Sequence, residues 1–97
     1  MWTGSLVVEL LLGDVHSLKE KRSVVRPIVA ALKQVGVSAA EVGHLDLHRR
    51  AQVGVAVVAA DAARCREVLA TCERLVAGRP EVEVLSAHTQ LYQEGDE

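Results

Sequence analysis

Residues 2–12 alternate between large apolar and polar side chains, the pattern of a strand with one buried face. The apolar positions are Trp2, Leu6, Val8, Leu10 and Leu12. Three further strands are predicted, in residues 37–44, 51–60 and 81–92.

The segment between the first two strands predicts a helix over residues 17–35. Ser17 followed three residues later by Glu20 is typical of a capping box, in which two side chains satisfy amides left unpaired at a helix start. Gly36 is placed to end the helix.

A second helix is predicted from Asp61, a capping residue, to Gly78, because its apolar positions recur on one face. The order βαββαβ in a short chain predicts an α+β fold of ferredoxin-like type, with a four-stranded antiparallel sheet and both helices on one face. Right-handed crossovers place the first and third strands in the centre of this sheet. We expect one domain over residues 1–92 and an acidic tail over residues 93–97.

The other face of the sheet is predicted to be uncovered and only partly polar. Its predicted residues are Thr3, Ser5, Val7, Glu9 and Leu11 of the first strand and Gln52, Gly54, Ala56 and Val58 of the third. We expect no aromatic side chain on this face, which argues against the base stacking that RNA-recognition-motif proteins use. Its valines and leucine form an apolar patch, so a protein-interaction or homodimerisation module is the alternative function.

The composition supports one small domain: 49% of the 97 residues are hydrophobic, and the core must be aliphatic because there is no Phe, one Trp and one Tyr. No apolar run approaches the roughly 18 residues of a membrane-spanning helix, and the first residues do not resemble a signal peptide. We therefore expect a cytoplasmic protein without membrane contact. Cys65 and Cys72 lie about 10 Å apart on one helix, beyond disulfide reach, and are expected to be core residues.

The net charge of −2 argues against a generic nucleic-acid binder, but the charge is unevenly distributed. Residues 16–50 contain seven of the eleven Lys and Arg residues and only three of the thirteen acidic residues. A helical wheel places four of these cations on one exposed stripe of the first helix: Lys19, Arg22, Arg26 and Lys33. Lys21 falls toward the core side, where we expect its stem to bring the ammonium out to solvent at the helix end.

The cations in the first turn of this helix lie where the macrodipole is already positive, which is mildly unfavourable. A phosphate bound at the helix amides would relieve that repulsion. The predicted anion- or RNA-binding residues are His16, Lys19, Lys21, Arg22, Arg26, Lys33, Arg49 and Arg50. Two other interpretations stay open: an ordinary solvated helix face, or neutralisation of individual cations by Glu9 or Glu20.

Residues 44–48, HLDLH, would place His44, Asp46 and His48 on one side of an extended segment, as three metal ligands require. A polar hairpin tip is the simpler interpretation, and we predict no metal. The sequence has no glycine-rich phosphate loop and no recognisable nucleophile triad, so neither a cofactor nor an enzymatic activity is predicted. A small ligand-binding or catalytic site around His16, His44 and Asp46 stays a third alternative.

The segments HSLKEKRSVVRPIVAALK, VSAAEVGHLDL and AQVGVAVVA, with the opening MWTGSLVVELLL, resemble the YlxP family of small bacterial proteins, a domain of unknown function. This resemblance implies a ferredoxin-like fold, a cytoplasmic setting and gene neighbours in translation and ribosome maturation, but no assigned activity. It marks eight residues as family polar positions: His16, Lys19, Lys21, Arg22, Glu41, Gly43, His44 and Asp46. The chain departs from the family at His48, where an aromatic residue is usual.

Residues and resemblance together predict a non-catalytic RNA- or ribosome-associated factor that binds phosphates through its basic first helix. Glu41, His44 and Asp46 are predicted to form an additional polar site.

Overall fold

The first strand, β1 (Trp2–Leu12), buries alternate side chains in the computed structural model, which describes residues 1–95. Leu6, Val8, Leu10 and Leu12 are fully buried, whereas the residues between them are only partly covered. This is the alternation that the sequence predicts, because successive side chains of a strand point to opposite faces.

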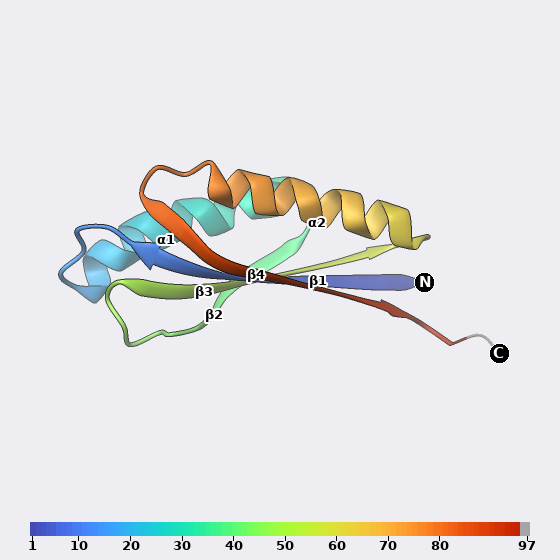
Figure 1. Ribbon diagram of the computed structural model, residues 1–97, viewed down its shortest axis with the longest axis horizontal. Helices are drawn as coiled ribbons and strands as arrows, with labels where there is room; N and C mark the ends of the chain where they lie inside the picture. Colours follow the sequence, from blue (N-terminus) through green and yellow to red (C-terminus); the bar gives the residue numbers. More distant parts are fainter. Residues whose placement is uncertain (96–97) are drawn as a thin grey trace.

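The order of elements is βαββαβ, as predicted (Figure 1). The other elements are α1 (Leu18–Gln34), β2 (Ser38–Gly43), β3 (Arg50–Ala59), α2 (Ala62–Ala77) and β4 (Val82–Gln93). The strands form one antiparallel sheet in the order β2-β3-β1-β4, so β1 and β3 are central. Both helices lie on one face, with α1 beside β2 and α2 over β1 and β4, which confirms the ferredoxin-like fold.

The helix ends follow the predicted caps. The Ser17 hydroxyl accepts a hydrogen bond from the Glu20 amide at 3.1 Å, and Asp61 accepts one from the Arg64 amide at 2.8 Å. The Glu20 carboxylate accepts from the His16 amide, one residue before the cap, at 2.7 Å. Gly36 has φ of +101°, a left-handed conformation that lets the chain turn from α1 into β2.

The core lies between the helices and the inner face of the sheet. α1 contributes Val25, Ile28 and Leu32, and α2 contributes Leu69 and Val76. Cys65 and Cys72 are both fully buried and unbonded, which confirms their prediction as core residues. Within residues 1–95, neither helix has the length and apolar character needed to cross a membrane.

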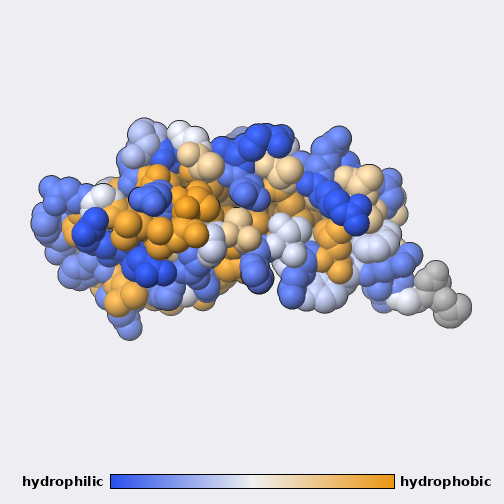
Figure 2. Space-filling model, in the orientation of Figure 1, coloured by the Kyte–Doolittle hydropathy of each residue, from blue (hydrophilic) through white to orange (hydrophobic). Residues whose placement is uncertain are grey.

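The molecule measures 51 × 22 × 20 Å, with its long axis along the strands. On the face shown in Figure 2, apolar side chains gather where β4 begins and β1 ends, and polar side chains cover the outer side of α2. β4 extends to Gln93, and the Glu94 amide donates to the Met1 carbonyl at 2.9 Å. The last two positions of the predicted acidic tail, residues 96–97, lie outside the described residues.

Candidate functional site

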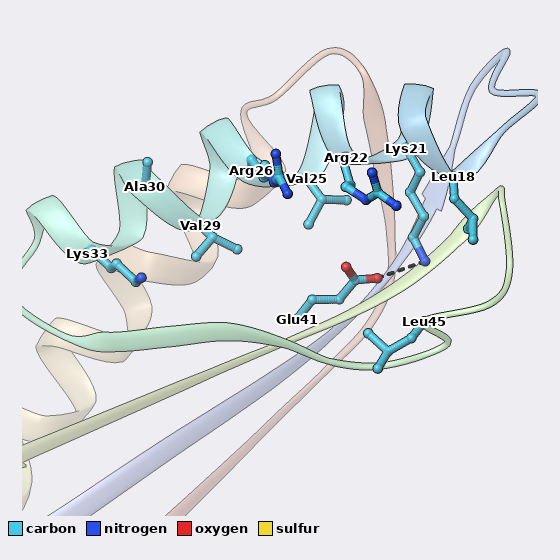
Figure 3. A pocket seen from close by; sticks show the side chains of 10 residues that line it. All are labelled: Leu18, Lys21, Arg22, Val25, Arg26, Val29, Ala30, Lys33, Glu41 and Leu45. Atoms are coloured by element: carbon cyan, nitrogen blue, oxygen red, sulfur yellow. Dashed lines mark ion pairs between the residues drawn. The ribbon is translucent and has the colours of Figure 1, made fainter.

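A groove of about 520 Å³ separates α1 from β2 and the loop that follows it (Figure 3). We call it the α1–β2 groove. Its apolar lining residues, which we call the apolar floor, are Leu18, Val25, Val29, Ala30 and Leu45. Its cationic rim is formed by Arg22, Arg26 and Lys33, and the remaining lining residues are Lys21 and Glu41. The groove thus places apolar surface next to positive charge.

The helical period places the cationic rim on one edge of α1. Arg22 and Arg26 are one turn apart, and Lys33 lies about 16 Å along the axis from Arg22. All three are exposed, and none forms an ion pair with a carboxylate of residues 1–95. The shared, exposed helix edge was predicted. Three of its four residues border the groove, because α1 packs beside the outermost strand β2.

Lys21 is enclosed in the protein, with only 2% of the residue exposed. Its Nζ lies 2.7 Å from Oε2 of Glu41 and donates to the His44 carbonyl at 2.6 Å. The expectation that this ammonium reaches solvent is therefore wrong. A carboxylate of β2 and a carbonyl of the following turn supply acceptors inside the fold, so the charge is neutralised by the protein itself.

The other predicted anion-binding residues divide into two groups. His16 pairs with Asp14 at 2.7 Å, Arg50 pairs with Glu9 at 3.3 Å, and the Arg49 Nε donates to the carbonyls of Leu12 and Gly13. Lys19, by contrast, is exposed and has no ion pair within the described span, like the three residues of the cationic rim. Five of the eight predicted residues, these four and Arg49, thus have no ion pair with a carboxylate of residues 1–95, and of the five only Arg49 is held by backbone carbonyls.

A second polar cluster lies on the open face of the sheet around Glu9. Its carboxylate accepts hydrogen bonds from Gln52, from the His44 ring at 2.8 Å and from Arg50. These contacts, led by the Gln52 hydrogen bond and followed by His44 and Arg50, lower the pKa of Glu9 despite its partial burial. Glu9 therefore neutralises Arg50 rather than a cation of the first helical turn. The direct pairing of Glu9 with Gln52 follows from the β1–β3 register.

His44 connects this cluster to the buried Lys21 ion pair. It has φ of +58°, and its carbonyl accepts from the Leu47 amide at 3.0 Å, so residues 44–47 form a turn. The extended HLDLH segment considered from sequence is therefore not formed. Asp46 and His48 are exposed, and no grouping of three metal-ligating side chains occurs in residues 1–95. Of the predicted polar site, Glu41 and His44 meet at Lys21.

The open face of the sheet carries the predicted partly apolar surface. Val58 is 63% exposed and Val42 is 52% exposed. The expectation that this face holds no aromatic side chain is wrong: Tyr92 pairs directly with Thr3 and is 55% exposed. Paired residues of an antiparallel sheet share a face, so Tyr92 lies with Thr3 on the open side.

Comparison with known proteins shows the family of this chain and a relative from a bacterium. The family described as "Protein of unknown function (DUF503)" matches residues 3–89. The chain is also similar to "Uncharacterized protein YlxP" of Bacillus subtilis (strain 168), with 28% identity over 85 residues that cover 87% of this chain and 92% of the relative. The predicted resemblance to YlxP-like proteins is confirmed.

Proposed function

The chain belongs to the DUF503 family, proteins of unknown function, and we propose that it is a non-catalytic RNA-binding factor, associated with ribosomal RNA, that contacts phosphates through α1. One observation carries the proposal. Lys19 and the cationic rim (Arg22, Arg26 and Lys33) form a row of exposed positive charges without an ion pair in residues 1–95.

Two other cations of the same basic segment, residues 16–50, are by contrast matched by carboxylates. Lys21, next to Arg22 in sequence, is matched by Glu41, and Arg50 is matched by Glu9. A surface that leaves neighbouring charges unmatched repels itself, and an incoming polyanion removes that repulsion. Phosphate contacts of this kind fix position rather than read sequence, so binding should depend on salt and only weakly on sequence.

The first test is the salt dependence of binding to ribosomal RNA fragments, measured by fluorescence anisotropy between about 50 and 200 mM salt. The variant Arg22→Glu/Arg26→Glu should bind more weakly, because neither side chain can then neutralise a phosphate. The slope of the logarithm of the binding constant against the logarithm of the salt concentration should become smaller in magnitude by about 1.4. The matched control is Arg66→Glu/Arg74→Glu, which makes the same charge change on the exposed side of α2. Equally weakened binding in both variants would mean that affinity responds to net charge and not to α1.

The exposed apolar residues of the open sheet face favour a second candidate function, homodimerisation. Val42, Ala56 and Val58 are exposed on this face, and Val7 beside them is partly exposed. Sedimentation velocity at rising concentration tests it. A dimer that Val58→Asp disrupts, and that the exposed α2 control Ala70→Asp preserves, would support this candidate. A wild type that stays monomeric at high concentration removes it.

A further inference from the structure

The α1–β2 groove contains an apolar floor that phosphate binding does not require. A ligand that presents only phosphates would contact the cationic rim and leave the apolar floor without a partner. Val29 and Leu45 line that floor, and Leu45 is 59% exposed. Apolar surface beside a row of positive charge fits a ligand that combines negative charge with a flat apolar face, as a nucleotide does.

We propose that this groove binds single-stranded RNA, with an unstacked base on the apolar floor and the flanking phosphates at Arg22 and Arg26. The inference rests on the proposed function and names its substrate class. In a duplex the bases are stacked on one another, whereas an unpaired base can be turned out and packed against protein, including the planes of arginine guanidinium groups.

The position of Glu41 indicates which wall of the groove the RNA backbone would face and which wall the base would face. Glu41 lies on the β2 side of the groove, opposite the cationic rim, and its carboxylate points between the two walls (Figure 3). Oε2 of Glu41 is buried and lies 2.7 Å from Lys21 Nζ in an ion pair, and neither carboxylate oxygen accepts a hydrogen bond within residues 1–95. Because Lys21 neutralises this carboxylate, the β2 wall offers phosphate no unpaired cation, and the cations that attract the RNA backbone lie on the α1 side. The other oxygen, Oε1, can accept from the amino edge of a base.

The difference in charge between the α1 wall and the β2 wall also favours RNA over an acidic peptide as the occupant. The carboxylates of such a peptide would project to both walls, and on the β2 wall they would face Glu41, an acceptor, and no unpaired cation among the lining residues. In a nucleotide, the charge is confined to the backbone and the base edge carries hydrogen-bond donors. Arg22 and Arg26, about 6 Å apart along the helix axis, flank the floor from one side only.

The experiment compares four labelled probes: a short unstructured RNA strand, the duplex of that strand with its complement, inorganic polyphosphate, which has no bases, and an acidic peptide. The strand should bind at least about tenfold tighter than the duplex. The floor variant Val29→Thr/Leu45→Ser keeps every charge and should remove this preference while leaving polyphosphate binding unchanged. Val58→Thr/Leu85→Ser, which alters exposed apolar residues elsewhere, is the control and should keep the preference.

The outcomes separate this inference from the proposed function. Equal affinity for strand and duplex, with both abolished in Arg22→Glu/Arg26→Glu, would overturn base insertion but leave phosphate binding by α1 intact. A strand preference that survives the floor variant would also overturn it. Binding of none of the probes would overturn both, and tighter binding of an acidic peptide than of either RNA would assign the groove to a protein partner.

Discussion

The Nζ atom of Lys21 lies 2.7 Å from Oε2 of Glu41, with the Lys21 side chain 3% exposed and the Glu41 side chain 21% exposed. The pair joins α1 to the edge strand β2 at one end of the α1–β2 groove. It holds the two walls together where the floor begins. Loss of this pair should therefore lower the free energy of unfolding of the protein even when no ligand is present.

Removing one partner of this pair should be strongly destabilising. Glu41→Met leaves a buried ammonium with the His44 carbonyl as its remaining acceptor among the described residues, and should lower the free energy of unfolding by about 3–5 kcal/mol. The double variant Lys21→Met/Glu41→Met should be less destabilised, because no buried charge is left unmatched. Urea unfolding of both single variants and the double variant completes the cycle. A Glu41→Met protein as stable as wild type would show that the pair is solvated in solution.

Lys21 and Glu41 also show which features of the site can be predicted from the sequence and which cannot. The helical period correctly directed Lys21 toward the core, because that direction depends only on its own helix. Its acceptor lies twenty residues further along the chain in β2. No local pattern links Lys21 to Glu41, since their contact depends on how α1 packs beside the outermost strand. The ammonium was therefore expected at the surface when it is in fact enclosed.

Local rules predicted most of the fold correctly. The alternation of β1, the caps at Ser17 and Asp61 and the central position of β3 depend on periods, capping chemistry and crossover handedness. The polar hairpin tip at residues 44–48 was the simpler interpretation of the sequence, and the structure has a turn there. The left-handed conformation of His44 was not predicted, because a positive φ in a residue other than glycine has no sequence signature here. The α1–β2 groove was not predicted either, since its width depends on packing between elements distant in sequence.

The hydrogen bonds to Glu9 make stability depend on pH in a defined direction. Its folded pKa is lowered from the ordinary value of 4.5, so the unfolded chain binds the proton more readily. The stabilisation is present above pH 4.5 and is lost as the pH falls below it, through the folded pKa. Glu9→Gln should therefore be less stable than wild type at neutral pH, and this difference should shrink on acidification.

Denaturant unfolding at several pH values measures this difference. Glu73→Gln, an exposed residue of α2 without an ion pair in residues 1–95, is the control. A gap between Glu9→Gln and wild type that stays constant, or widens, as the pH falls would contradict the assigned direction.

The two cysteines should be inert in the folded protein. Cys65 and Cys72 are fully buried, and burial raises the pKa of the Cys72 thiol, which lowers its thiolate fraction. Reaction with a thiol reagent such as DTNB should be at least about 10³-fold slower in native buffer than in urea, because it requires opening of the core. Two equivalents should react in urea. Fast labelling of one thiol under native conditions would mean that α2 opens locally without global unfolding.

The last prediction concerns the first turn of α1, where Lys19 is exposed, lacks an ion pair within residues 1–95 and lies next to the capping residues. A cation at this end of a helix opposes the macrodipole, so Lys19→Glu should stabilise the free protein by about 0.3–1 kcal/mol. The same change should weaken RNA binding, because it replaces a phosphate contact with a repulsion.

Lys33 provides the matched comparison, because it is the basic residue in the last turn of the same helix. There a cation complements the macrodipole, so Lys33→Glu should destabilise the protein by a similar amount while also weakening RNA binding. Two equal charge changes on one helix edge are thus expected to shift stability in opposite directions and affinity in the same direction. Urea unfolding and RNA anisotropy measure the two quantities. If Lys19→Glu is destabilising, the first-turn cation does not strain the empty helix; if it binds RNA like wild type, Lys19 lies outside the interface.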